Sequence, residues 1–372
     1  MPPSLRRKTS IPCLLSLLIF TTTAGHGAVF ENEKLTVTAD LRARLESDYD
    51  SQRADGRERD DRVRVRLRAR LGLELRLASQ LSLGLRLRSG SKNSQQSPHV
   101  TVFDADGGDT EAGDLNLDRA YFETRRKRGK VWLGRNGLPF WKQNELYWDD
   151  DVTPLGMGFV FGAYKGKDEK LAVRGGYFAL PVGMREFAGE LGALQLEYSS
   201  TRLTAALGVL AFEADPEDRD AATLLRGNGG RDYKIWIGSL QGRLDAGRGV
   251  TLGLDILHNS ENYDQAMAPR DDVDGLVISA RYGALTEPGT WFLAYTYARI
   301  ETLAVQSSYA EDDWVRWGTA SETLSSDLRG HELQFAHALA KQMNLVVRWY
   351  FVEAITTSED GNRLRIDFNY TW

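Results

Sequence analysis

Cysteine is almost absent from this sequence, which contains one among 372 residues. That residue, Cys13, lies in an apolar N-terminal stretch, and the Ser10-Ile11-Pro12 run before it is unlike a lipoprotein cleavage box. If the stretch is removed, the remaining chain holds no thiol. Such a chain can form neither a disulfide scaffold nor a thiolate metal site, so both classes of protein are excluded.

Long apolar runs are also lacking. After the N-terminal region no stretch approaches about 18 uninterrupted apolar residues, so the sequence offers no transmembrane helix. The 42% of hydrophobic and 27% of charged residues would suit a soluble protein. They suit a transmembrane barrel equally well, because one-by-one alternation gives each strand an apolar and a polar face. If the chain enters a membrane, it does so as strands.

The N-terminal residues follow the order of a secretory signal. Basic residues at 6–8 precede the apolar run 11–20, and small residues follow at 24–28. We expect a cleavable signal peptide over 1–28, with the cut between about 25 and 29, and a single domain over 29–372. The signal holds three of the 47 basic residues and none of the 52 acidic ones, which leaves 44 against 52 and a charge of −8. This balance disfavours nucleic-acid binding.

Two-residue alternation begins directly after this region. Apolar and polar residues alternate from Leu35 to Glu46 and again from Arg62 to Leu77. A soluble strand averages about five or six residues, whereas about ten are needed for a tilted strand to cross a bilayer. A helix would scatter the leucines and arginines around all its sides. Both segments are therefore predicted to be membrane-spanning strands, and a tight turn at 78–80 joins the second to a third at 81–88.

Continued along the chain, the alternation predicts sixteen strands. Short turns and long loops alternate between them, as in outer-membrane barrels, and an even number leaves both chain ends in the periplasm. We predict an all-β fold, a transmembrane antiparallel up-and-down β-barrel of about sixteen strands. Fourteen and eighteen strands stay open, because Gly and Arg interrupt the pattern near 118–136 and 157–180. The expected strands are 35–46, 62–77, 81–88, 116–125, 130–136, 157–164, 170–180, 192–199, 201–212, 232–244, 250–257, 275–283, 290–300, 330–339, 343–353 and 362–372.

Catalytic signatures are missing as well. The sequence has no G-x-S-x-G, no H-E-x-x-H, no P-loop and no cysteine nucleophile outside the signal. His258-Asn259-Ser260 stands at a strand end, but neighbouring residues of a strand point to opposite faces and cannot converge as a triad. The acidic stretch Asp104–Asp114 is weakly similar to a calcium loop and lacks its bidentate glutamate. We expect no enzyme activity, no metal and no cofactor.

Aromatic residues stand near the ends of many expected strands, where they would form the interfacial girdles of a barrel. The last strand places Leu364, Ile366, Phe368, Tyr370 and Trp372 on one face. This pattern resembles the C-terminal β-signal of outer-membrane proteins. The resemblance implies that the barrel-assembly machinery binds the strand from Leu364 to Trp372.

Over nearly the whole expected mature chain the sequence resembles the putative porins of Gram-negative bacteria. The segments that carry the resemblance are Leu35–Leu45, Arg62–Leu87, Leu117–Tyr121, Trp132–Asn136 and Trp148–Gly156. The Leu-Gly-Arg segment and the long arginine strand are also similar to the alginate-export barrels. That family ranks second, because the chain is short for it and the Trp-Asp-Asp-Asp stretch fits the putative porins better. Neither resemblance fixes a substrate.

The face opposite the leucines of segment 62–77 carries six arginines. Each would cost about 2–4 kcal/mol on the lipid side at the midplane, so we expect all of them to face the lumen. Barrel closure brings 362–372 beside 35–46 and joins their arginines to the same wall, which Arg348 extends. The predicted pore-lining residues are Arg42, Arg44, Arg62, Arg64, Arg66, Arg68, Arg70, Arg86, Arg88, Arg348, Arg363 and Arg365.

Positive charge is expected to dominate this wall and to raise the local concentration of anions. Asp40, Glu46, Glu74 and Asp367 would neutralise some of it. A salt-bridge lattice that merely supports the barrel is the alternative interpretation, and both can hold at once.

The stretch 137–156 is the third outer loop of the expected barrel. In sixteen-stranded porins the third loop folds inward and narrows the channel, and the resemblance implies that this one places its carboxylates opposite the arginine wall. A solvated outer loop is the alternative. The predicted constriction residues are Trp148, Asp149, Asp150 and Asp151.

Together these patterns favour a porin in the outer membrane of a Gram-negative bacterium, reached through the periplasm and surrounded by outer-membrane lipid. We expect it to pass small hydrophilic solutes with a modest preference for anions. The alternatives are a polysaccharide export channel of the alginate type, or an outer-membrane enzyme or adhesin with a plugged barrel. The sequence leaves open a monomer or a homotrimer.

Overall fold

The computed structural model describes residues 34–105, 107, 108, 110, 113–215, 231–245, 249–264, 270–315 and 325–372. The expected signal peptide over 1–28 lies outside these residues. The described residues include no helix long and apolar enough to cross a membrane. The strands are β1 (Leu35–Gln52), β2 (Glu58–Arg59), β3 (Arg62–Ala78), β4 (Leu81–Gly90), β5 (Val100–Asp104), β6 (Asp114–Arg126), β7 (Gly129–Arg135), β8 (Leu155–Lys165), β9 (Glu169–Val182), β10 (Glu186–Ser200), β11 (Leu203–Glu213), β12 (Tyr233–Asp245), β13 (Val250–Asn259), β14 (Asp274–Gly283), β15 (Trp291–Ile300), β16 (Leu328–Ala340), β17 (Met343–Ala354) and β18 (Asp360–Thr371).

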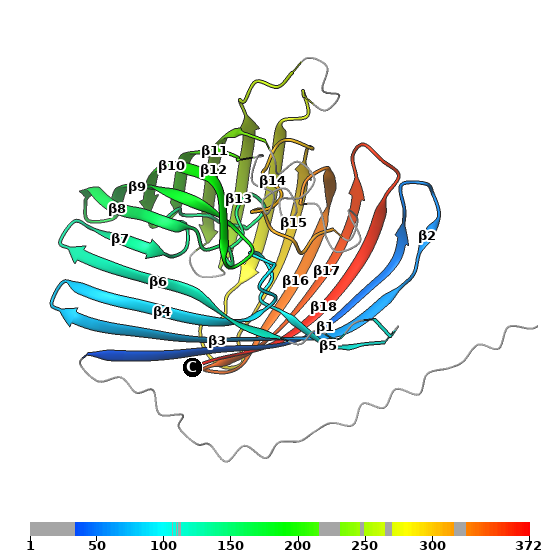
Figure 1. The fold of residues 1–372 in the computed structure, drawn as a ribbon, viewed down its shortest axis with the longest axis horizontal. Coiled ribbons are helices and arrows are strands. Elements are labelled where there is room, and N and C mark those ends of the chain that lie inside the picture. The colour runs from blue at the N-terminus through cyan, green and yellow to red at the C-terminus, as the bar shows by residue number, and fades with distance from the viewer. Residues whose placement is uncertain are drawn as a thin grey trace, which may run out of the picture.

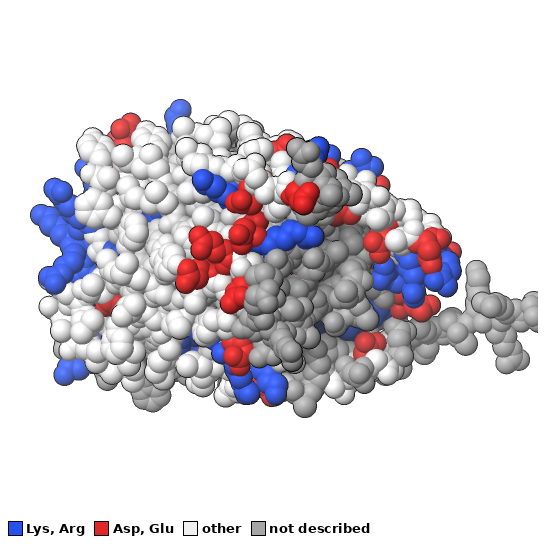
Figure 2. Space-filling view, turned by 45° about the horizontal axis from the view of Figure 1, so that its top comes forward, with Lys and Arg blue, Asp and Glu red and all other residues white. Residues whose placement is uncertain are grey.

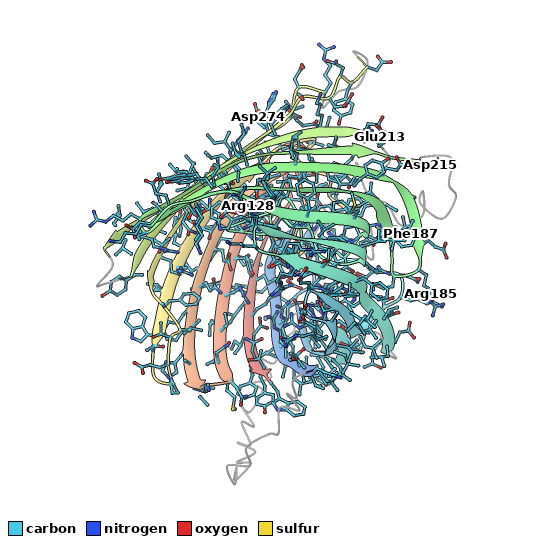
Figure 3. The ribbon with its side chains drawn as sticks, turned by 90° about the vertical axis from the view of Figure 1, so that its left-hand side faces the viewer. Arg128, Arg185, Phe187, Glu213, Asp215 and Asp274 are labelled. Carbon is cyan, nitrogen blue, oxygen red and sulfur yellow. The ribbon has the colours of Figure 1, made fainter. Side chains whose placement is uncertain are left out.

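Sixteen of these strands close into one antiparallel barrel, in which β18 pairs with β1 (Figure 1). The two others, β2 and β5, are short segments within the first two long loops and pair with β1 and β3. The predicted fold class and strand number are therefore confirmed. Figure 3 labels Arg128 from the short turn between β6 and β7, and Glu213 and Asp274 from the long-loop end.

The pairing of β1 with β3 shows why these segments are strands. The two pair without a register shift from Leu35↔Leu75 to Asp48↔Arg62. Alternation turns Leu41 outward, where it is 47% exposed, and turns Arg44 inward, where it is 1% exposed. Transfer of a leucine side chain from water to lipid contributes about 1.5–3 kcal/mol, so each correctly placed leucine holds the register. In Figure 2 much of the left-hand part of the barrel body is uncharged, with Lys and Arg at its left-hand end, while Asp and Glu gather in the middle of the view and charges of both signs lie toward the right.

Several strands run past their predicted ends at the long-loop rim. β9 continues to Val182 and β10 begins at Glu186, with the pair Glu186↔Val182 at their tip. Alternation marks only the membrane-spanning portion of a strand, whereas backbone pairing continues above it. The intervening turn is made possible by Gly183, whose φ is +60°, a conformation that glycine adopts without steric cost.

Three long loops enter the barrel, and we call them L2 (91–99), L3 (136–154) and L7 (301–327, described over 301–315 and 325–327). L3 and L7 pack against the inward face of β11–β15, which is apolar near the long-loop end. Trp148 of L3 stacks on Tyr309 of L7 at 5.8 Å and on Phe212 of β11 at 6.3 Å between ring centroids. The largest apolar cluster of the described chain is therefore inside the barrel, under two loops.

Candidate functional site

The arginines of the predicted wall share the inward face of five neighbouring strands, β1, β3, β4, β17 and β18. Strand pairing sets Arg42 opposite Arg68 on one side and opposite Asn369 on the other, so side chains of three strands meet. All twelve arginines of the predicted set are described. Eleven of them form ion pairs with carboxylates, several of which are shared, and Arg88 instead donates to backbone oxygens of L2 and L3.

Glu46, at the outer half of β1, is one of these carboxylates. It forms ion pairs with Arg64 and with Arg365, the latter at 2.7 Å, and lies 3.7 Å from Arg66. Its own side chain is fully buried. One carboxylate from β1 thus connects guanidinium groups of β3 and β18 across both of its strand boundaries.

Asp367 of β18 has the same role at the next position along the wall. It accepts two hydrogen bonds from Arg44, at 2.7 and 3.0 Å, and one from Arg348 at 2.8 Å. Arg42 lies 3.8 Å away. A bidentate arginine–carboxylate pair is among the strongest charge-assisted contacts in proteins, so the wall is a lattice of ion pairs as well as a row of cations.

The neutralising carboxylates differ somewhat from the expected set. Asp40 pairs with Arg68 at 2.7 Å, but Glu74 forms no ion pair within the described residues. Asp48 and Asp118 do: Asp48 binds Arg62 at 2.7 Å and Arg363 at 2.5 Å, and Asp118 binds Arg86. Asp48 lies in phase with the inward residues of β1, two positions past the predicted strand end, whereas Asp118 lies at a register shift between β6 and β4, where alternation gives no signal.

L3 crosses the barrel interior from wall to wall. Gln143 donates a hydrogen bond to the Leu254 carbonyl oxygen of β13 at 2.9 Å, and Asn144 donates to Asp255 at 2.5 Å. On the opposite side Asp151 forms an ion pair with Arg70 of β3. The loop is therefore held at both ends of its crossing.

The four predicted residues of L3 have different surroundings. Trp148 is buried in the apolar cluster, and Asp149 is buried beside it. Asp150 pairs with Lys142 at 2.6 Å and keeps 67% of its side chain exposed. Asp151 alone reaches the arginine wall. Its backbone oxygen also accepts from Arg88, whose buried guanidinium donates to the Ser94 carbonyl oxygen at 2.6 Å and so joins L2 to L3.

The pKa values of the carboxyl groups of L3 are shifted in opposite directions. Burial raises the pKa of Glu145 to about 7, against the nearby Lys142. Burial, with the charge of Asp151 and Glu145, raises the pKa of Asp149 well above its usual range. Burial would raise the pKa of Asp151 too, but Arg70 and the arginines beside it hold it below its usual value. Near neutral pH, L3 therefore carries both neutral and ionised carboxyl groups.

L7 is a second loop in the interior, which the sequence patterns did not predict. Its backbone binds that of L3, with the Asp149 nitrogen donating to the Tyr309 oxygen at 2.8 Å and the Glu311 nitrogen to the Glu145 oxygen at 3.0 Å. Asp313 reaches the arginine wall. The signal that was available is on β12, where Tyr233, Ile235 and Ile237 put apolar side chains on the inward face and require a cover.

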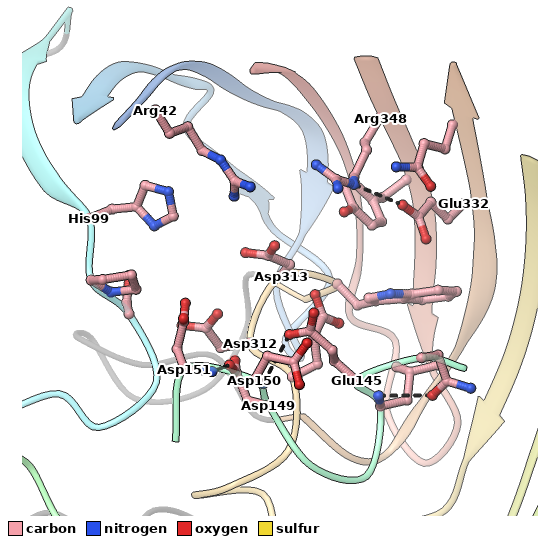
Figure 4. Close-up of a pocket in the computed structure, with 18 of the residues that line it drawn as sticks. Arg42, His99, Glu145, Asp149, Asp150, Asp151, Asp312, Asp313, Glu332 and Arg348 are labelled. Atoms are coloured by element: carbon pink, nitrogen blue, oxygen red, sulfur yellow. Dashed lines mark hydrogen bonds and ion pairs between the residues drawn. The ribbon is translucent and has the colours of Figure 1, made fainter. Parts of the chain in front are cut away.

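A cavity of about 420 Å³ lies between the loops and the wall (Figure 4). Arg42, Arg68 and Arg348 bound one side, and carboxyl groups of L3 and L7 bound the other. His99 of L2 is buried at its edge. Burial and the neighbouring arginines lower its pKa well below the usual value, so its imidazole is neutral at neutral pH. The cavity is thus a water-accessible space that is lined by opposed charges.

The two weaker sequence candidates do not assemble. His258 turns outward and pairs with Asp274 at 2.8 Å, whereas Asn259 turns inward and donates to the Leu303 carbonyl oxygen at 2.8 Å. Ser260 accepts from Trp236 instead of facing the histidine. Of the acidic stretch Asp104–Asp114, the residues 106 and 109 lie outside the described portion of the chain.

Comparison with known proteins agrees with this geometry. Residues 32–190 match the family model described as Putative porin. Over these residues the chain is similar to that family, and this match together with the barrel fold supports an outer-membrane porin. The resemblance drawn from its segments is therefore confirmed. A search of the curated proteins gave no match.

Solved porin structures share the fold of this porin at low sequence identity. OprB of Pseudomonas putida has a TM-score of 0.59 at 14% identity, covering 91% of this chain and 94% of its own. OmpF of Salmonella typhi, in a complex with daunomycin, has a TM-score of 0.54 at 11% identity, covering 91% and 97%. A triple mutant of the Rhodopseudomonas blastica porin has a TM-score of 0.50 at 12% identity, covering 90% and 100%. The porin accordingly belongs in a Gram-negative outer membrane, and family and fold point to a channel rather than an enzyme.

Proposed function

We propose that this porin is a passive diffusion channel for small hydrophilic solutes, with an arginine-lined path and a modest preference for anions. The observation that carries the proposal is the row of guanidinium groups along the cavity and the wall above it, several of which keep part of their surface open despite their ion pairs. Arg348 is 21% exposed and Arg42 18% exposed in the side chain. Cations that line a narrow aqueous path raise the local concentration of anions.

The preference is modest because the path has two signs of charge. Carboxyl groups of L3 and L7 face the arginines across the cavity. An anion gains from one side and is repelled by the other, so a neutral polar solute passes as well. This arrangement favours general permeation over tight binding of one substrate.

The proposal is tested by replacing Arg64, Arg66 and Arg68 together with serine. We expect the reversal potential in a KCl gradient across a planar bilayer to shift toward cation selectivity, because three positive charges leave the path. The matched control removes three arginines outside it, Arg57→Ser with Arg128→Ser and Arg202→Ser, and should leave the potential unchanged. A triple wall variant that behaves like this control would refute the arginine-lined path.

A plugged barrel that supports an adhesin or an enzyme is the rival interpretation, since three loops occupy the interior. The two differ in conductance. The channel gives ohmic single-channel steps in a planar bilayer, whereas a plugged barrel gives none. A substrate-specific export channel of the alginate type would conduct and then lose its conductance on adding anionic polysaccharide at micromolar concentration.

We further propose that the porin forms a homotrimer through the outward face of β3 and β4. These two strands contain no aromatic residue, whereas β6 presents Phe122 and β18 presents Phe368 to the outside. Aromatic girdles mark strands that meet lipid headgroups, so a gap in the girdle suits contact with another copy. Leu71→Trp with Leu85→Trp should convert the detergent-solubilised trimer to monomer, as measured by light scattering after gel filtration. A mass equal to one chain for the unaltered protein would refute the trimer.

Export and assembly complete the proposal. The segment 1–28 directs the chain to the periplasm, and the strand from Leu364 to Trp372 binds the barrel-assembly machinery. Support comes from the pairing of this strand with β1, including mutual backbone hydrogen bonds of 2.7 Å between Ala39 and Trp372. Phe368→Ser with Tyr370→Ser should leave the chain in the periplasm, as followed by membrane fractionation.

A further inference from the structure

L7 brings one carboxylate into the middle of the arginine wall. Asp313 forms ion pairs with Arg44 of β1, at 3.4 Å, and with Arg365 of β18. Its backbone oxygen accepts a hydrogen bond from Arg363 at 2.6 Å. A single loop residue thus contacts three arginines from the two strands that close the barrel.

The position of L7 does not depend on this contact. Leu303, Ala304 and Val305 are fully buried against the inward face of the barrel. L2 also holds the loop, with Gln95 donating to the Ser308 carbonyl oxygen at 2.7 Å and Gln96 to that of Ser307 at 3.1 Å. The side chain of Asp313 can therefore be changed while the loop keeps its place.

We infer that Asp313 of L7 is a selectivity-determining residue, which sets the anion preference by neutralising the centre of the arginine wall. The inference rests on the proposed arginine-lined path. It differs from the expected role of L3, whose Asp151 meets Arg70 on β3. L7 contacts the other side of the wall, at β1 and β18.

Charge counting supports this role. Around the contact, eight arginines of β1, β3, β17 and β18 face four carboxylates of the same wall or its neighbour. Asp313 is a fifth carboxylate, supplied from outside the wall. The eight arginines are Arg42, Arg44, Arg62, Arg64, Arg66, Arg348, Arg363 and Arg365, and the four carboxylates are Glu46, Asp48, Glu332 and Asp367.

The pKa values of the neighbouring carboxyl groups shift in the opposite direction to that of Asp313. Although burial alone would raise it, the pKa of Asp313 is held below its usual range by Arg365 and Arg44. Burial raises the pKa of Glu311 and of Asp312, and the negative charge of Asp313 raises both further. Asp313 is therefore the carboxylate of this run whose ionised form its surroundings favour.

The first test is Asp313→Asn, measured as the reversal potential of the full porin in a KCl gradient. One unit charge about 7 Å from the ion path, at the dielectric constant of water and with screening at about 0.1 M salt, changes the anion-to-cation permeability ratio by about threefold. We expect the chloride-to-potassium ratio to rise by that factor. The matched control is Asp271→Asn, which removes one carboxylate from an outer loop where its side chain is 86% exposed, and which should leave the ratio unchanged.

The second test returns the charge chemically. In a Cys13→Ser background, Asp313→Cys is treated with a methanethiosulfonate that adds either a sulfonate or a quaternary ammonium group. The sulfonate should bring the chloride-to-potassium ratio back toward the unaltered value, and the ammonium group should raise it further. Reagent-dependent shifts of opposite sign also place the residue in the ion path.

The outcomes separate this inference from the function on which it rests. If the wall triple variant shifts selectivity but Asp313→Asn and the modified cysteine do not, the arginine-lined path stands and the role of Asp313 is refuted. If neither the triple variant nor Asp313→Asn shifts it, the path itself is refuted. Circular dichroism and heat-dependent migration in gels confirm that each variant is a folded barrel before its selectivity is compared.

Discussion

The inward faces of the two halves of the barrel differ in polarity. Along β1, β3 and β18 the inward residues are mostly charged, and together with Arg348 of β17 they meet one another in ion pairs. Along β11–β15 the inward residues near the long-loop end are apolar, as at Leu210, Ile235 and Leu257, and they are covered by L3 and L7. Exposure of an apolar surface to water inside the barrel is unfavourable in free energy. In the proposed channel, water and solutes pass along the charged half, and the loops that narrow the path are anchored on the apolar half.

The difference also explains why the loops stay inside. Loops usually lie on the surface because their backbone groups need hydrogen bonds. Here backbone groups of L3 and L7 form hydrogen bonds with each other, and stacked rings from both loops add apolar contact. The apolar half thus holds a small core of its own within the barrel.

The largest expected effect tests this interior core. Trp148→Ala should lower the free energy of unfolding by about 3–5 kcal/mol, because removing a fully buried indole between Tyr309 and Phe212 leaves a cavity. It should also raise single-channel conductance as L3 loosens. Urea titration in detergent and planar-bilayer recording measure the two. Trp236→Ala, on the lipid-facing side of the same half, is the control, and an equal loss of stability there would remove the distinction between the two halves.

A smaller effect is expected for the ion-pair lattice of the charged half. Asp367→Asn should lower the free energy of unfolding by about 2–3 kcal/mol, because the buried guanidinium group of Arg44 and the partly buried one of Arg348 lose their charged acceptor. The same urea titration measures it. Asp255→Asn serves as control, since Asp255 is a buried carboxylate of the other half that accepts a hydrogen bond from Asn144. A smaller loss for Asp367→Asn than for Asp255→Asn would contradict a structural role for the lattice.

The smallest expected effect is the pH dependence of ion selectivity. It involves both halves, because L3 contacts the walls of both. The Glu145 carboxyl is neutral below its pKa of about 7 and negative above it. Selectivity should therefore move toward cations by about twofold between pH 6 and pH 8. Because the folded pKa is raised, ionisation also weakens the packing of L3 as pH rises from about 4.5 through 7.

Reversal potentials at a series of pH values measure this effect. Glu145→Gln should remove most of the change, because its amide does not ionise. Asp313→Asn should shift the whole curve toward anions without changing its slope, because Asp313 is ionised throughout. An unaltered slope in Glu145→Gln would assign the titration to another group.

Alternation in the sequence was sufficient to predict the barrel, its sixteen strands and the inward placement of the arginines. The reason is local: a strand exposes successive side chains to opposite faces, and lipid accepts only one kind of them. The same rule, extended two residues past the predicted strand 35–46, would also have located Asp48, whereas Asp118 lies at a register shift that the rule does not follow. It failed for the interior loops, because a loop has no period that says which wall it contacts.

What the sequence by itself determined is the outside and the wall: an apolar face toward lipid, a charged face toward water, and the closure of β18 on β1. Only the tertiary structure decided the inside of the path, where L3 and L7 pack on the apolar half and where Asp313 meets Arg44 and Arg365. The physical reason is that these contacts join residues far apart in the chain. Their energy comes from burial and charge pairing that exist only once the barrel has closed.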